Sequence, residues 1–186
     1  MSLSTAEPTI TESLKLKRYA VVGASFPQLE HAAQLLGPRA GGGHFPAYAD
    51  YRLSWSYVPR VSGLATSSRQ ACEVVHEQHH QGVAPAEVFV HAEFTLTLPR
   101  WTDARLSQDV TLRRRWARFL RRLRAHEHQH LRAGRRAAHK LGRSIAATPP
   151  QPDSVTLERV VAERAKRIQA QLRTDHGHID DHAVRL

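Results

Sequence analysis

The stretch LRAHEHQHLRAG, residues 123–134, lies inside a long proline-free segment and decides the expected fold. Within it, His126, Glu127 and His130 follow the order H-E-x-x-H. Four residues advance an α-helix by about 400°, so the two imidazoles would lie one turn apart on nearly the same face. Two such nitrogens can bind one tetrahedral zinc ion, with the glutamate as base for a water molecule. The stretch therefore predicts a helix that carries a metal site.

The chain contains 13 histidines in 186 residues, so the motif has to be weighed against chance. The frequencies of His and Glu give roughly 0.05 expected matches over all starting positions. The motif also continues an apolar stripe through Phe119 and Leu123, so it should face inward. Burying these polar groups is costly unless something binds them. The alternative is a solvated His-rich helix face, and His128, on another face, is expected to be exposed.

Runs typical of strands precede the long helix. Hydrophobic alternation and β-branched residues predict strands, and one short helix follows the first of them. Because the connections between the strands are short, we expect an antiparallel sheet. The predicted strands are RYAVVGAS (18–25), YRLSWSYV (51–58), ACEVVHEQHH (71–80) and AEVFVHAEFTLTLP (86–99), and the short helix lies in FPQLEHAAQLLG (26–37).

A second helix follows the breaker ATPPQPDS, residues 147–154, with Asp153 or Ser154 as its cap. Its apolar stripe consists of Leu157, Val161, Ala165, Ile168 and Leu172. The sequence thus predicts an α+β fold. An antiparallel sheet packs against a long active-site helix, which starts near Asp103 or Asp109, and against a second C-terminal helix.

Length and composition indicate one domain at residues 17–177, between a flexible N-terminal arm at 1–16 and a polar C-terminal tail at 178–186. Cys72 is the single cysteine, so no internal disulfide can form. No secretory signal and no run of 18 apolar residues is found. We expect a cytoplasmic protein as the sequence is written, or a secreted one if a signal was removed or another export route is used.

A catalytic zinc site needs a third protein ligand. The extended motif of metzincins would require glycine at 133 and histidine at 136, where this chain has Ala133 and Arg136. Glu158 and Glu163 on the second helix are candidates, and so is His176 in RTDHGH. The residues by themselves leave these alternatives open.

The order of features resembles a bacterial domain-of-unknown-function family of predicted secreted zinc-dependent proteases, assigned to the zincin-like H-E-x-x-H metallopeptidases. The resemblance covers roughly residues 18–177. It includes a strand that ends in Leu-Pro-x-Trp, a tryptophan about ten residues before the motif, and a Thr-x-His-Gly after the second helix. The segments that carry it are YAVVGAS, CEVVHEQHHQGVAPAEVFVHAEFTLTLPRW, LRRRWARFLRRLRAHEHQHLRAGRRAAHKL and RTDHG.

The resemblance implies a zincin-like fold, peptide hydrolysis and His176 as the third zinc ligand. This chain departs from the family pattern where Ala170-Gln171 replaces a Tyr-Asp pair, and where the second cysteine between the helices is missing. The expected activity is that of a zinc metallopeptidase. His126, His130 and His176 would hold Zn²⁺ with a water molecule, and Glu127 would act as the general base.

Further roles are expected around this site. The strand EFTLTLP, residues 93–99, could be a sheet edge that pairs with an extended peptide substrate. Asp175 could orient a ligand histidine, or simply occupy a turn or a helix cap. His178 is a weak candidate for stabilising an oxyanion.

The net charge of +10 suggests a different class of function. Arginines crowd the motif helix from Arg113 to Arg136. They can form a solvated face whose stems cover apolar surface, or they can bind a polyanion such as nucleic acid. The competing hypothesis is thus a non-enzymatic metal- or polyanion-binding protein, including a degenerate zincin that binds metal without turnover.

Overall fold

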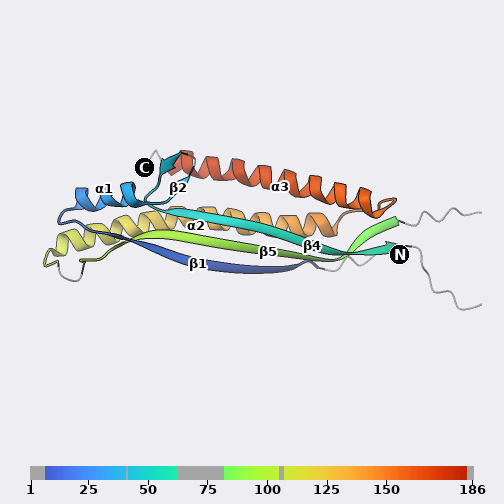
Figure 1. Cartoon of the computed structure of the whole chain (residues 1–186), viewed down its shortest axis with the longest axis horizontal. Coiled ribbons are helices and arrows are strands. Elements are labelled where there is room, and N and C mark those ends of the chain that lie inside the picture. Colours follow the sequence, from blue (N-terminus) through green and yellow to red (C-terminus); the bar gives the residue numbers. More distant parts are fainter. Residues whose placement is uncertain (1–6, 41, 63–81, 105–106, 184–186) are drawn as a thin grey trace, which may run out of the picture. The chain divides into compact units, whose positions relative to one another are not determined.

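The computed structural model describes residues 7–40, 42–62, 82–104 and 107–183. It has an α+β fold with two long helices and a mixed sheet (Figure 1), so the α+β part of the predicted fold class is confirmed. The strand predicted at 71–80, with Cys72, lies outside the described residues. In chain order the elements are β1 (Thr9–Val21), α1 (Phe26–Leu36), β2 (Arg39–Ala40), β3 (Gly43–His44), β4 (Tyr48–Ser62), β5 (Gly82–Trp101), α2 (Val110–Ala146) and α3 (Ser154–Ala183).

The chain divides into two compact units. The first unit comprises residues 1–11, 54–91 and 137–171, and the second comprises residues 12–53, 92–136 and 172–186. The long elements β1, β4, β5, α2 and α3 contribute residues to both units. The H-E-x-x-H motif belongs to the second unit.

The main sheet has the strand order β1-β5-β4 and is mixed, which corrects the predicted antiparallel sheet. Thr11 lies beside Val90 and His91, and the Thr102 N–H donates to the Val21 carbonyl. The sequence separation is therefore nearly constant along β1 and β5, as in a parallel pair. In a mixed sheet of this order, β4 then runs antiparallel to β5. The prediction failed because α1 and β4 lie between β1 and β5 in sequence, and such a long connection permits parallel pairing.

The strand expected to be a sheet edge is in fact central. Residues 93–99 belong to β5, which lies between β1 and β4. From Val88 to Leu98 every second side chain of β5 is buried, among them Val90 and Phe94, as expected for a strand with one face in a core. The edges of this sheet are β1 and β4.

Both ends of the predicted domain differ from the structure. β1 begins at Thr9, inside the segment predicted as a flexible arm. α3 continues to Ala183 and includes residues predicted as a polar tail. In both cases the polar composition suggested loose chain. The pairing of β1 with β5, and the packing of the one-sided apolar stripe of α3, depend on distant residues.

The two long helices begin where side chains cap them. The Leu112 N–H donates to Asp109 Oδ1 at 2.8 Å, and the Thr156 N–H donates to Asp153 Oδ1 at 2.7 Å. Both aspartates satisfy amides that have no partner inside the helix. The predicted stripe of α3, Leu157 through Leu172, is buried as expected. Among the described residues, no helix is long and apolar enough to cross a membrane.

The core of the second unit explains the two tryptophans of the family resemblance. Trp101, at the end of β5, and Trp116, on α2, are both buried, with ring centroids 6.4 Å apart in an edge-to-face arrangement. Val21 and Leu29 complete this cluster from β1 and α1. Such an aromatic pair stabilises packing beyond the area that it buries. These tryptophans therefore hold α2 against the sheet upstream of the motif.

Candidate metal centre

The motif lies on the inward face of α2, as the apolar stripe predicted. Glu127 and His130 are only 4% and 8% exposed, whereas His128 is exposed. One turn after His130, Gly134 lies against the ring of Phe94 on β5, and a Cβ at this position would be 2.6 Å from the ring. Glycine therefore permits a close approach of α2 to β5 next to the site.

α3 brings Asp180 to the two motif histidines. Asp180 Oδ1 lies 3.3 Å from His126 Nε2 and 3.1 Å from His130 Nε2, and the two Nε2 atoms are 3.2 Å apart. Within the part of the chain that the structure describes, these three residues form the one group able to hold a metal ion. Sequence reasoning missed Asp180 because it assigned this segment to a tail.

The donor set and its spacing fit a tetrahedral metal. Zinc binds nitrogen and oxygen ligands at about 2.0–2.2 Å, which in a tetrahedron separates neighbouring ligand atoms by about 3.3–3.6 Å. The three observed separations are close to this value. Two imidazoles and one carboxylate are also a common set for a catalytic zinc, since they leave one coordination position open.

His176, predicted as the third ligand, lies at the other nitrogen of His130. The two Nδ1 atoms are 2.6 Å apart, and the rings are parallel within 5°. Tyr51 on β4 stacks on the ring of His176, with 4.9 Å between the ring centroids. The structure therefore brings His176 into the site, but the third atom beside the two Nε2 atoms belongs to Asp180.

The placement of His176 also corrects the local structure expected around it. His176 and Gly177 lie inside α3 and not in a turn after it, and so does Asp175. In a continuous helix, His176 and Asp180 are one turn apart, the same spacing as His126 and His130. This second i, i+4 pair could have indicated Asp180 as a site residue from the sequence. It is recognised only if the second helix is extended through Gly177.

Burial changes the acid–base behaviour of the motif. The pKa of Glu127 is raised to about 7, chiefly because the carboxyl group is removed from water and partly because of the charge of Asp180, while a hydrogen bond from the Ala49 N–H opposes the shift. Burial lowers the pKa of His130 to about 4, against the effect of Asp180. His130 is therefore neutral at pH 7, which is the form that binds metal.

Tyr48 is a second residue that sequence reasoning missed. Burial raises the pKa of its phenol, and the charges of Asp50, Asp180 and Glu127 raise it further. The phenol therefore stays protonated and able to donate a hydrogen bond near the motif. No pattern in the sequence indicated Tyr48, because its position near the motif depends on where β4 begins. His178, the weak candidate for stabilising an oxyanion, is exposed on α3.

The raised pKa of Glu127 predicts a pH-dependent difference in stability. Between about pH 4.5 and 7 the metal-free native state keeps a proton on Glu127 that the unfolded state loses, so stability falls as pH rises through this window. Glu127→Gln removes this titration. In chelated protein, the stability of the variant relative to wild type should increase by about 3 kcal/mol between pH 4.5 and 8. Urea unfolding at both pH values measures this change, and a constant difference would contradict it.

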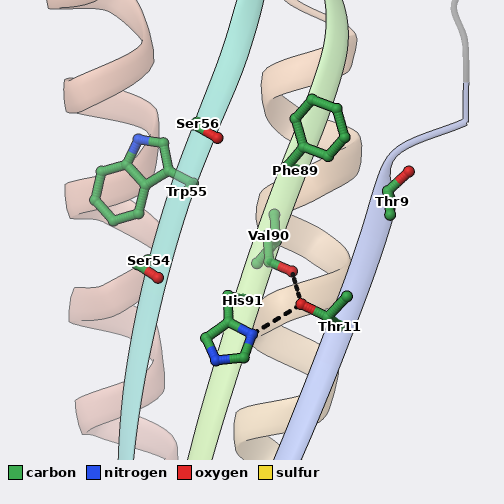
Figure 2. Close-up of a pocket in the computed structure, with 8 residues that line it drawn as sticks. All are labelled: Thr9, Thr11, Ser54, Trp55, Ser56, Phe89, Val90 and His91. Carbon is green, nitrogen blue, oxygen red and sulfur yellow. Dashed lines mark hydrogen bonds between the residues drawn. The ribbon is translucent and has the colours of Figure 1, made fainter.

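The remaining candidate ligands do not belong to the same compact unit as the motif. Glu158 and Glu163 are exposed residues of the first unit. A pocket in the first unit lies over β1, β5 and β4 (Figure 2), and the Thr11 hydroxyl within it is 2.8 Å from His91 Nδ1. It contains no residue of the motif. Its lining consists of Thr9, Thr11, Ser54, Trp55, Ser56, Phe89, Val90 and His91.

Comparison with known proteins identifies the family but no characterised relative. Neither the curated proteins nor the solved structures include a match to this chain. One family matches residues 16–183, a span that contains the motif, Trp101, Trp116 and Asp180, and its description is "Bacterial protein of unknown function (DUF922)". Because the match covers most of the sequence, the chain belongs to the DUF922 family of bacterial proteins.

Proposed function

We propose that this protein is a zinc-dependent metallopeptidase with a zincin-like active site. The observation that carries the proposal is the convergence of His126 Nε2, His130 Nε2 and Asp180 Oδ1, with mutual distances of 3.1–3.3 Å, next to the buried carboxylate of Glu127. The burial of Glu127 beside His130 is destabilising by itself. A bound cation would compensate for this arrangement.

His126, His130 and Asp180 would hold the ion, and His176 would orient His130. A ligand histidine usually donates its second N–H to an acceptor, which fixes the ring. The contact of 2.6 Å between His130 Nδ1 and His176 Nδ1 suits this role, with His176 as the acceptor. Zinc in such a site acidifies water and polarises a carbonyl group.

Glu127 supplies the proton transfers. It takes a proton from the attacking water while the water oxygen bonds to the peptide carbonyl carbon, and it returns a proton to the nitrogen as the C–N bond breaks. The Ala49 N–H holds the Glu127 carboxylate. Tyr48 is a protonated donor available to the negative charge that develops on the carbonyl oxygen.

An extended peptide would pair with the outer edge of β4, through the backbone groups that Glu127 and Asp50 do not already engage. β4 is an edge strand. The Ala49 N–H donates to Glu127 and the Tyr51 N–H donates to Asp50 Oδ1, so both amides point away from β5. Alternate residues of a strand present their backbone groups on the same side. This edge therefore leads directly to Glu127 and replaces residues 93–99 as the proposed docking strand.

The test is hydrolysis of a mixed library of unstructured peptides by zinc-loaded protein, followed by mass spectrometry. We expect cleavage that chelation abolishes and added zinc restores, because the metal acts at the reacting carbonyl. Cleavage that survives complete removal of metal would contradict the proposal. Bound zinc without cleavage of any library member would instead identify a metal-binding protein without turnover.

A further inference from the structure

The outer side of α2 carries a dense group of arginines, which we call the arginine face. These side chains are exposed, and all belong to the second unit. Arg115 of the same helix packs over the ring of Phe26 at 4.1 Å and is not included in the arginine face. The arginine face consists of Arg113, Arg114, Arg118, Arg121, Arg122 and Arg124.

The arginine face has a defined shape. At about 100° per residue, its members cover about 180° of the helix circumference, opposite the buried Trp116. At about 1.5 Å per residue, they extend over about 16 Å along the axis. The surface is therefore a convex ridge that is positive on its crest and on both flanks.

The charge of this ridge is not neutralised locally. The sequence has no acidic residue from Val110 to His126. Asp109, just before the helix, is engaged as its cap. Among the described residues, no ion pair joins the arginine face to a carboxylate, whereas Arg135, further along α2, pairs with Glu12 at 2.8 Å. Six guanidinium groups are therefore left for an external anion.

We propose that the arginine face docks the phosphate backbone of double-stranded DNA. The major groove of B-DNA is wide enough to admit an α-helix and has phosphates on both walls. These phosphates can contact the arginines on both flanks of the ridge. A flat membrane would contact only the crest, and the apolar residues of this helix, such as Leu112 and Trp116, are buried and unable to insert. Trp116 and Phe119, the aromatic residues between Arg113 and Arg124, pack in the core cluster and so are not available to stack on unpaired bases.

The proposal does not depend on the metal site, and salt titration tests it. We would measure binding of a labelled duplex by fluorescence anisotropy between 50 and 200 mM salt. If all six arginines contact phosphates, the affinity should fall about 10³-fold over this range. The triple variant Arg118→Gln/Arg121→Gln/Arg122→Gln should reduce the slope of log affinity against log salt by about 2.7.

The matched control removes three positive charges from exposed positions of α3, in Arg159→Gln/Lys166→Gln/Arg167→Gln. It should keep the wild-type slope, and circular dichroism should show both variants folded. Equal weakening by both variants would overturn the proposal, because net charge alone would explain it. Absence of duplex binding at 50 mM salt would also overturn it. A third contrary outcome combines two results. Binding to phosphatidylserine vesicles would require the arginine face, and duplex binding would not require it.

Discussion

Replacing Glu127 by glutamine is expected to lower peptide hydrolysis by about 10²–10⁴-fold while the zinc content stays at about one per chain. The amide is similar in shape to the carboxylate and can still contact the Ala49 backbone, but it cannot accept a proton from water. Glu127 belongs to none of the three ligand positions, so the metal should remain. Activity would be measured as initial rates on a peptide that the zinc-loaded protein cleaves, with zinc measured by elemental analysis.

The matched control for this prediction is His128→Gln. His128 is the next residue on the same helix, but its side chain is exposed. Its variant should keep wild-type rates and zinc. Undiminished hydrolysis by Glu127→Gln, with zinc bound, would exclude Glu127 as the general base. Loss of zinc from Glu127→Gln would show that the lower rate results from the missing metal and not from the missing proton transfer.

The second large effect concerns the identity of the third ligand. Asp180→Ala and His130→Ala should each abolish stoichiometric zinc binding, because two remaining protein ligands do not make a stable catalytic site. His176→Ala should keep zinc but with an affinity lowered about 10–100-fold, as expected for a residue that orients a ligand from behind. Zinc per chain and competition with a chromogenic chelator give both quantities.

The comparison of Asp180→Ala with His176→Ala distinguishes two possible ligand sets. The third ligand beside the two motif histidines is either Asp180 or His176. If His176→Ala loses its zinc and Asp180→Ala retains it, then His176 is the ligand that the family resemblance implies, and the carboxylate only supports a histidine. His128→Ala, on the exposed side of α2, is the control for adventitious binding. Circular dichroism must show folded protein for each variant, so that loss of zinc is not loss of structure.

Much of the local structure could be predicted because its causes are local. The spacing of His126 and His130, the cap at Asp153 and the stripe of α3 depend on residues within a few positions of one another. The strand arrangement could not be predicted in this way. β1 and β5 pair about 80 residues apart, and a polar, alternating β1 read alone is compatible with a loose arm.

The sequence by itself determined that His126, Glu127 and His130 share one inward helix face, because helix geometry relates neighbours four residues apart. Only the tertiary structure decided which residues meet that face. Asp180 lies about fifty residues after the motif, and Ala49 comes from a strand almost eighty residues before it. Such contacts follow from how the core orders its strands and helices, through the burial of side chains distant in sequence, and no local spacing encodes them.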